Sequence, residues 1–303
     1  MAVVNRTNEL KQLEPGLNAI FGQTYKGYDM EHKELFDHES SDRAYEEEVL
    51  FTGFAGAVDK NEGAAVTYDT ATESWVSRYN HTTVALAFAM TEEAMEDNLY
   101  ESLSVRLTKA LARSMAHTKQ VKAANVFNNA FDSDYAGGDG VELCDASHPL
   151  VDGGTISNVT AVDLSETALE DALITIAGWT DDRGIPVALN GRKLAIPKNL
   201  CFVAERLLSP SATERTGTAE REINAINSKG MLPDGYVINH RFTDTDAWFV
   251  LTDAPDGLKY FERIGVQTAF EGDFETGNMR YKSRERYSFG WSDWRRVLGS
   301  SGA

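Results

Sequence analysis

The chain has 303 residues, with 29 Lys and Arg against 47 Asp and Glu, which gives a formal net charge of −18 at pH 7. Hydrophobic residues make up 42%, enough to bury a sizeable core in one large or two ordinary domains. A chain this acidic is poorly suited to gripping phosphate backbones as its main task, because that work needs clustered Lys and Arg.

Cysteine usage and hydropathy exclude further classes of protein. The two cysteines, Cys144 and Cys201, are too few for a disulfide framework and fit a reducing compartment. We expect neither a secretory signal nor a membrane span, because no apolar run has the required length.

Charge is unevenly distributed along the chain. Residues 277–303 contain six basic and two acidic residues, whereas the remainder is strongly acidic. This asymmetry fits complementary surfaces on copies of the same protein, and it equally fits a basic strand folded onto its own acidic domain. The sequence alone leaves both alternatives open.

The first half of the chain predicts an arm, a β excursion and a long helix, in that order. Residues 1–48 mix glycines with isolated apolar residues and predict an arm with one or two short helices. Residues 49–90 are rich in β-formers and turn residues and predict a two-stranded excursion, which is marginal in water and needs a partner surface. From Thr91 to Phe127, apolar residues recur every four positions and predict a spine helix roughly 55 Å long.

The second half mixes helices and strands without a regular βαβ repeat, which favours an α+β fold. After a loop over 132–158, the predicted elements are helices at 163–179 and 199–208 and strands at 192–197, 236–238 and 247–251.

The clearest strand pattern covers Met279 to Trp291, with residues 265–270 as its predicted partner strand. Apolar and aromatic residues occupy most odd positions, whereas the even positions carry the cations Arg280, Lys282, Arg284 and Arg286. We expect the aromatic face in the core and the cations on a polar face or against a neighbouring subunit. The alternative, in which the cations bind phosphates and the aromatics stack on bases, is disfavoured because the two sets point to opposite sides.

Motifs for chemistry are mostly absent. No glycine-rich phosphate motif and no G-x-S-x-G nucleophile motif occurs. Cys144 lies four residues before His148, which could pair a thiol with a base, but such spacing is more often incidental. Residues 132–137 begin like a calcium loop but lack the ligands expected at the fifth and twelfth positions. We therefore predict no catalytic residue, cofactor or metal ligand.

Three local motifs accompany this order of elements: residues 17–22 followed by 25–36, residues 193–200 with the helix after them, and residues 286–295 before Gly299. Together they resemble the tailed-phage major capsid proteins with the Hong Kong 97 phage fold, particularly the Mu-like major head subunit branch. The resemblance covers essentially the whole chain in order.

The resemblance implies an α+β major capsid fold and assigns a part to each region. Residues 1–48 would be an N-arm, 49–90 an E-loop, 91–162 the spine helix of a P domain with its following loop, 163–253 an A domain, and 254–303 the C-terminal strands of the P domain. The E-loop would lie on an adjacent subunit, the arm would brace a neighbour, and opposed charges would pair between subunits.

The function implied is that of a major capsid (head) protein that assembles into pentamers and hexamers of an icosahedral shell around double-stranded DNA, in the cytoplasm of a bacterial host. Its partners would be copies of itself, a separate scaffolding protein, a portal protein and, in some shells, a decoration protein. The DNA would be held without sequence-specific contacts, along an acidic inner wall that lets the duplex slide. No membrane is involved.

Two other functions remain as alternatives. An encapsulin-like compartment has the same fold but holds protein cargo. A soluble acidic α+β enzyme would be a compact monomer or dimer with a pocket and perturbed titratable groups.

Candidate intersubunit contacts follow from the excursion and the final strand. They are Lys60, Glu62, Trp75, Arg280, Lys282, Arg284 and Arg286. Some members of the family join a loop lysine to a neighbour's asparagine. Lys60 matches that position, although a turn lysine is the simpler interpretation.

Overall fold

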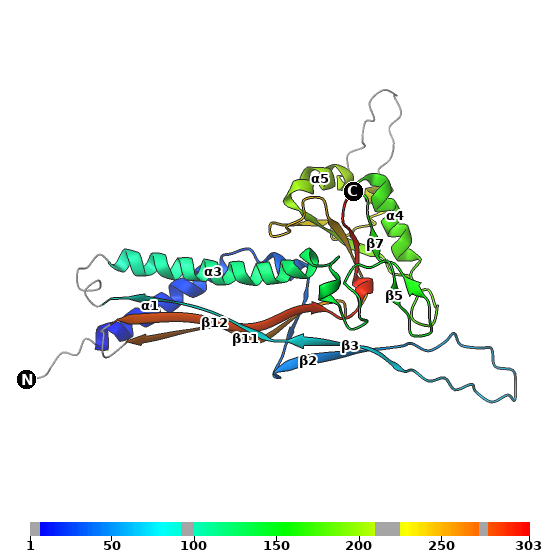
Figure 1. Cartoon of the computed structure of the whole chain (residues 1–303), viewed down its shortest axis with the longest axis horizontal. Coiled ribbons are helices and arrows are strands. Elements are labelled where there is room, and N and C mark those ends of the chain that lie inside the picture. The colour runs from blue at the N-terminus through cyan, green and yellow to red at the C-terminus, as the bar shows by residue number, and fades with distance from the viewer. Residues whose placement is uncertain (1–6, 92–99, 210–224, 273–277) are drawn as a thin grey trace, which may run out of the picture.

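The computed structural model describes residues 7–91, 100–209, 225–272 and 278–303. Figure 1 shows an elongated molecule with a long sheet and two helices at one end and a second α+β unit at the other, as the predicted α+β class requires. The helices at the first end are α1 (Thr7–Lys26) and α3 (Tyr100–Asn128), and those of the second unit include α4 (Glu166–Ala177) and α5 (Cys201–Leu208).

The long sheet has four strands in the order β1 (Asp37–Ser40), β11 (Leu258–Gly272), β12 (Met279–Trp291) and β4 (Thr82–Met90). β1 runs parallel to β11, and the other pairs are antiparallel. The predicted strand from Met279 to Trp291 and its partner are thus confirmed. Along its first half β12 alternates buried and exposed residues, with Met279 and Tyr281 in the core and Arg280 and Lys282 in solvent.

Helices α1 and α3 cover one face of this sheet. Leu17 and Phe21 of α1 are almost fully buried against Leu111 and Met115 of α3. The expectation of one or two short helices in the arm is wrong in length, because α1 is one 20-residue helix that includes Pro15. Burial of the apolar face of α1 outweighs the helix-breaking tendency of Pro15.

The predicted spine helix is α3, whose 29 described residues correspond to about 43 Å. Its predicted first turns at residues 92–99 lie outside the described residues.

The second unit is built on a five-stranded sheet in the order β7 (Val159–Thr160), β13 (Val297–Ser300), β10 (Trp248–Thr252), β8 (Gly191–Pro197) and β9 (Tyr236–Asn239). The predicted helices and strands of this region are present. Helix α4 begins after Ser165, whose Oγ accepts a hydrogen bond from the Ala168 N–H. Strand β13 comes from the C-terminus, so residues 254–303 contribute to both sheets.

Short elements complete the chain: η1 (Glu31–Glu34), β2 (Tyr45–Phe51), β3 (Glu73–Asn80), η2 (Ser133–Tyr135), β5 (His148–Pro149), β6 (Thr155–Ile156), η3 (Lys198–Leu200), α6 (Ala225–Ser228) and η4 (Trp294–Arg296).

A shared core joins the two units where the end of α3 meets the five-stranded sheet. Phe127 of α3 is 1% exposed, and its ring centroid lies 5.8 Å from that of Phe36, 5.4 Å from that of Phe242 and 5.1 Å from that of Phe249. Strand β10 is buried along its whole length because this core covers one face, around Phe249, and the α4–α5 core covers the other, around Val250. Both units are therefore held by one continuous apolar junction.

His32 fixes the segment between α1 and β1 onto α3. Gln120 of α3 accepts a hydrogen bond from the His32 backbone N–H at 3.1 Å, and its Nε2 donates to His32 Nδ1 at 2.8 Å. The first bond fixes the orientation of the Gln120 side-chain amide, so its NH₂ group faces His32 Nδ1. Nδ1 accepts this hydrogen bond and must therefore be unprotonated. Burial, together with the nearby Lys119 ammonium, lowers the pKa of His32 to about 4.

Replacing Phe127 by Ala removes the ring that both units share. We expect the F127A subunit to lose about 3–5 kcal/mol of unfolding free energy, measured by urea denaturation. The control Ile174→Ala, at a side chain 71% exposed on α4, is expected to stay within about 0.5 kcal/mol of the parent. A loss in F127A no larger than that of the control would contradict the shared core.

Neutral His32 makes stability depend on pH. Since its folded pKa is lowered to about 4, the unfolded chain takes up the proton first as pH falls below about 6.5, and folding stability is lost down to pH 4. We expect this one group to account for about 3 kcal/mol over that range. The measurement is urea unfolding of the parent and of His32→Gln from pH 7 to 4, where the difference between the two should shrink as pH falls. A constant difference would show that His32 does not titrate as described.

Candidate assembly surfaces

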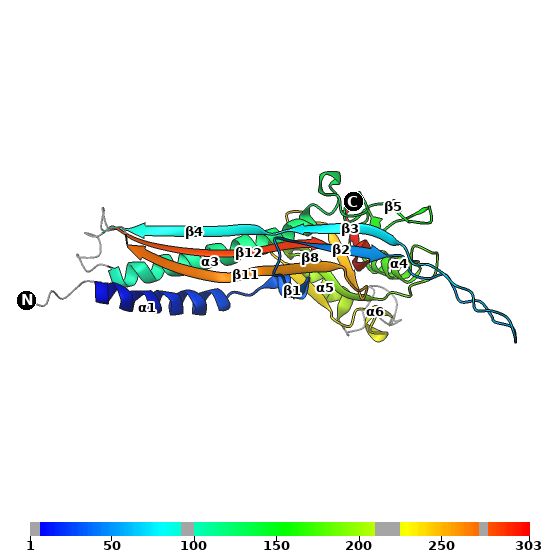
Figure 2. The ribbon, with the colours of Figure 1, turned by 90° about the horizontal axis from the view of Figure 1, so that it is seen from below.

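Strands β2 and β3 form a two-stranded ribbon that leaves the long sheet. They pair antiparallel from Tyr45 opposite Asn80 to Phe51 opposite Glu73, and residues 52–72 continue beyond them as an extended loop. Figures 1 and 2 show this loop projecting past the second unit. Strand β4 belongs to the long sheet, so the excursion predicted over 49–90 returns to that sheet at Thr82.

The loop, together with Phe51 at the end of β2, carries large apolar side chains that a single subunit leaves in water. Tyr68 is 94% exposed, and the others are each more than 60% exposed: Phe51, Phe54, Val58 and Val66. Lys60 and Glu62 are exposed within the same loop, whereas Trp75 is half-buried in β3. Apolar residues gathered on a projecting segment are typical of a surface that is covered by a partner.

Polar contacts hold the root of the loop to the second unit. The Asp69 carboxylate accepts hydrogen bonds from the Ala55 N–H at 2.7 Å and from the Thr70 N–H at 2.9 Å, and these bonds lower the pKa of Asp69. Arg183 donates to the Thr70 carbonyl at 2.8 Å and lies 3.6 Å from the Asp152 carboxylate. The loop therefore leaves the body in a defined direction.

Lys259 is a clamp at the base of the ribbon that sequence reasoning missed. Its buried ammonium pairs with Glu48 of β2, with Glu39 of β1 at 3.1 Å and with Asp256 at 3.0 Å. Burial opposes its charge, but the hydrogen bonds to these three carboxylates raise the pKa of Lys259 above its usual range. A lysine inside the apolar run 258–261 was the available signal.

The sheet face opposite α1 and α3 is open within the described part of the chain. On it, Lys282 lies between Ala87 of β4 and Ala269 of β11, and Arg284 lies between Ala85 and Gln267. These two cations, and Arg280 on the same face, are exposed, and their neighbours on β4 are alanines. Lys282 and Arg284 make no ion pair with a described residue.

Arg286 differs from the other three predicted cations. It is half-buried and donates to the Ala44 carbonyl at 3.4 Å, in the connection between β1 and β2. The structure therefore groups Arg280, Lys282 and Arg284 on one face and places Arg286 at the ribbon's base. Lys60 and Glu62 lie apart from both, on the projecting loop.

The buried face of β12 contains a charge pair that the strand pattern did not reveal. Glu285 is 1% exposed, and its Oε2 lies 2.5 Å from the Lys119 ammonium of α3 and accepts a hydrogen bond from the Tyr25 hydroxyl at 3.1 Å. Burial raises the pKa of Glu285, while Lys119 opposes that shift. The pair links α1, α3 and β12 in the core.

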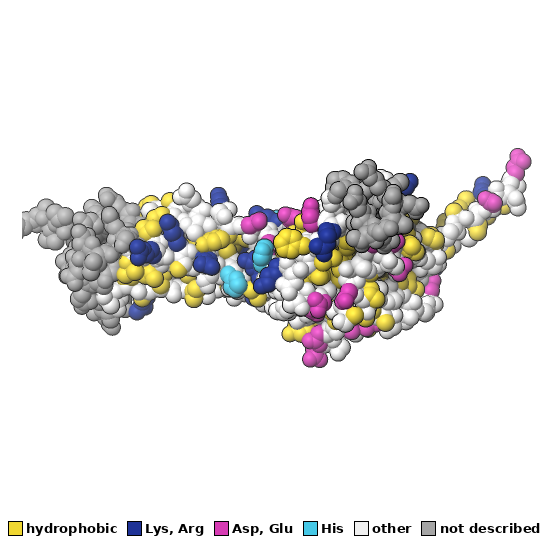
Figure 3. Space-filling view, turned by 90° about the horizontal axis from the view of Figure 1, so that it is seen from above, with side chains coloured by type: hydrophobic (Ala, Val, Ile, Leu, Met, Phe, Trp, Pro, Cys, Tyr) yellow, Lys and Arg dark blue, Asp and Glu magenta, His cyan; other side chains and the backbone are white. Residues whose placement is uncertain are grey.

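The face of the molecule drawn in Figure 3 is unevenly charged. In Figure 3, Lys, Arg and His side chains recur along the narrow half, whereas Asp and Glu gather on the broader half and on the projecting loop. The groove between the 25–38 segment and β11, of about 1040 Å³, is lined by side chains that already serve packing, such as His32 and Lys119.

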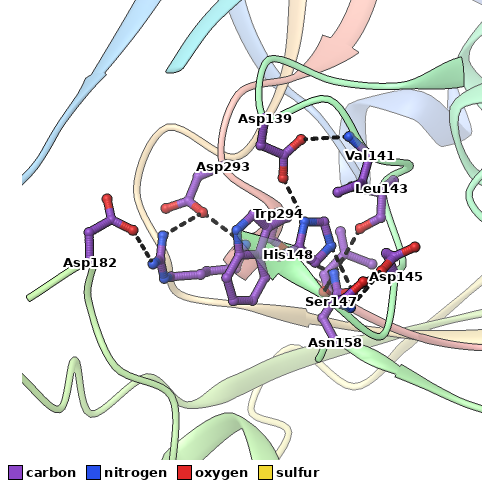
Figure 4. Close-up of polar contacts among 12 residues, drawn as sticks. Asp139, Val141, Leu143, Asp145, Ser147, His148, Asn158, Asp182, Asp293 and Trp294 are labelled. Carbon is purple, nitrogen blue, oxygen red and sulfur yellow. Dashed lines mark hydrogen bonds and ion pairs between the residues drawn. The ribbon is translucent and has the colours of Figure 1, made fainter. Parts of the chain in front are cut away.

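The buried cluster in Figure 4 resembles catalytic machinery but has no free nitrogen. His148 Nδ1 lies 2.6 Å from Asp139 Oδ2, and Nε2 lies 3.1 Å from Asn158 Oδ1. The Asn158 amide is fixed because its Nδ2 donates to the Leu143 carbonyl at 2.8 Å and to the Val297 carbonyl at 3.0 Å. Each ring nitrogen already has an oxygen partner, so neither is free to act as a base or a metal ligand.

The Cys144 thiol does not complete a nucleophile with His148. Burial raises the pKa of Cys144 well above its usual range, which keeps it as a thiol. Instead, the cluster joins distant segments: the backbone of Asn158 accepts from the Gly299 N–H at 2.9 Å and donates to the Asp145 carbonyl at 3.1 Å. We interpret this hydrogen-bonded cluster as a structural link between the loop over 132–158 and strand β13.

Among the described residues, no set of three or more His, Cys, Asp and Glu side chains is placed to hold a metal ion. Within the same part of the chain, no helix combines the length and the hydropathy of a membrane span.

Comparison with solved structures identifies the fold. The chain superposes on the capsid protein of the native GTA particle with a TM-score of 0.57 at 13% identity, covering 91% of each chain. The capsid protein of cyanophage P-SCSP1u gives a TM-score of 0.57 at 10% identity, covering 89% of this chain and 86% of that one. The virus-like particle of Pyrococcus furiosus gives 0.51 at 10% identity, covering 94% and 97%.

Sequence comparison identifies the family. No curated protein matches the chain significantly. The family model described as phage capsid protein matches residues 75–299, which is most of the sequence. The projecting ribbon, the long helix on its sheet and this match agree, and the chain belongs to the phage capsid protein family, with the Hong Kong 97 phage-like major capsid fold.

Proposed function

We propose that this protein is the major head protein of a tailed bacteriophage and assembles into the pentamers and hexamers of an icosahedral shell that encloses double-stranded DNA. Beside the family, the observation that carries the proposal is the projecting loop over 52–72. Its exposed apolar side chains have no cover in one subunit, and a neighbouring copy supplies that cover in a shell.

The subunit's contacts suit this role. The Lys259 clamp and the Arg183 contacts hold the ribbon and loop, which we assign as the E-loop, at a fixed angle to the body. A fixed angle lowers the ordering cost of each contact when the loop docks on a neighbour. The long sheet with α3 would be the P domain and the five-stranded unit the A domain, with residues 1–48 as the N-arm.

The flat cationic face of the long sheet is a second proposed contact. Arg280, Lys282 and Arg284 would meet acidic residues of a neighbouring copy, which the strongly acidic remainder of the chain provides. The tip residues Lys60 and Glu62, with Trp75 and Arg286 nearer the ribbon's base, would lie at or beside the loop's contact.

The proposal includes further partners in the assembly. A separate scaffolding protein would guide shell closure in the host cytoplasm, a portal protein would occupy one vertex, and a decoration protein would bind the outside in some shells. DNA would be enclosed without sequence-specific contacts.

A second candidate is an encapsulin-like compartment, which the likeness to the virus-like particle of Pyrococcus furiosus favours. The two differ in their contents. Nuclease-resistant DNA inside purified particles supports the phage head, whereas particles that hold protein and no nucleic acid support the compartment.

Deleting residues 59–63 is expected to leave a folded subunit and to impair assembly, because this stretch is exposed and makes up the loop's far part. Circular dichroism and thermal unfolding test the fold, and size-exclusion chromatography with light scattering tests assembly. A deletion that unfolds the subunit, or one that assembles normally, would contradict the assignment of this loop as the E-loop.

A milder variant separates the apolar contact from loop length. Phe54→Ser with Tyr68→Ser should reduce assembled particles at least tenfold at equal concentration, since two exposed aromatic contacts are lost from every interface. The matched control is Ile174→Ser, another exposed apolar residue on α4, which should assemble as the parent does.

A further inference from the structure

We propose that the outer face of α3 is a phosphate-binding stripe that contacts enclosed duplex DNA. The stripe consists of Arg106, Lys109, Arg113 and His117. The inference rests on the proposed enclosure of DNA, and it departs from the expectation that an acidic chain offers the duplex no phosphate contact.

Helix α3 has a charge pattern opposite to that of the whole chain. From Ser102 to Asn128 it contains no Asp or Glu, whereas the protein has 47 of these residues and a net charge of −18. Its other two lysines are engaged: Lys119 pairs with buried Glu285, and the Lys122 ammonium donates to the Thr82 hydroxyl at 2.6 Å. The remaining cations are exposed.

The stripe forms one line on the helix. Its members are three or four residues apart, which places them on the same face, over about 16 Å from Arg106 to His117. A duplex carries one charge per strand about every 3.4 Å, so the line spans about five phosphates of one strand. Figure 3 shows Lys, Arg and His side chains recurring along this half of the molecule.

The acidic side chains described near the stripe are too few to cancel its positive charge. Arg106, Lys109 and Arg113 make no ion pair with a described residue. At the far end, a hollow of about 370 Å³ brings Asp29 and Glu31 near Arg113 and His117. Glu31 is already bound by Arg241 at 2.5 Å and by His240 at 2.8 Å, so it is not free to neutralise the stripe.

The composition of this face fits a phosphate backbone better than a protein partner. Its exposed positions from Arg106 to His117 hold two Arg, one Lys, His117 and Ala110, with no Phe, Tyr or Trp. Protein interfaces have aromatic and apolar centres and are depleted in Lys, whereas contacts that position a duplex come from Lys and Arg to phosphate oxygens. The apolar side chains suited to a protein contact are on the loop over 52–72 instead.

The opposite sheet face supplies a matched control. Lys109→Gln with Arg113→Gln removes one Lys and one Arg from the stripe, and Lys282→Gln with Arg284→Gln removes the same charges from the other side of the same unit. All four residues are exposed, so both variants should melt as the parent does.

The experiment measures binding of a labelled 30-base-pair duplex of mixed sequence to the full-length unassembled subunit, by fluorescence anisotropy from 25 to 150 mM KCl. The expected result is salt-dependent binding whose slope of log affinity against log salt falls by about two in K109Q/R113Q, with at least tenfold weaker binding at 25 mM. K282Q/R284Q should retain the parental slope.

Three outcomes would overturn the stripe. They are no binding by the parent at 25 mM, an equal loss in both variants, or an unchanged slope in K109Q/R113Q accompanied by lost assembly, which would make the stripe a protein contact. Electron microscopy of the same preparations tests the shell separately. Shells that form while the slope is unchanged refute the stripe alone, whereas a parent that never assembles, even with its scaffolding protein added, refutes the proposed function.

Discussion

The packing of Phe127 against Phe36, Phe242 and Phe249 is the constraint on which the rest of the molecule depends. It anchors the end of a rigid helix on a sheet that is buried on both faces, so the two units cannot turn freely about each other. The chain passes the same junction again from β12 through η4 to β13. There the Asn158 side-chain amide donates hydrogen bonds to the carbonyls of Leu143 and Val297. The junction therefore sets how the two units are placed relative to each other.

Several buried charges are paired within the chain, whereas two distant surfaces carry exposed cations or apolar side chains. Glu285 with Lys119, His148 with Asp139, and Lys259 with its three acids each satisfy a buried or half-buried group within the chain. By contrast, Lys282 and Arg284 of the open sheet face and the aromatics of the projecting loop are exposed in the described subunit. This arrangement suits a subunit of a closed shell. Contacts within the chain stabilise the subunit, and separate exposed surfaces are available to bind its neighbours.

Local sequence patterns correctly predicted the elements that depend on side-chain periodicity or on a capping residue. The alternation in β12 follows from the two-residue period of a strand, and the start of α4 follows from the Ser165 cap. The length of α1 was not predictable, because burial of Leu17 and Phe21 against distant strands decides it. The roles of Lys259, Asn158 and Gln120 depend on partners far along the chain, so no spacing indicates them. Of the candidate contacts, the sequence predicted four cations on one face of β12; three of them are exposed there, whereas Arg286 is half-buried and turns to Ala44.

The most direct test of the account is negative-stain electron microscopy of the purified protein at high concentration, with light scattering on the same sample. The account predicts closed shells, or flat rings with five- and six-fold symmetry. A uniform compact monomer that stays monomeric at high concentration and with its scaffolding protein added would contradict it.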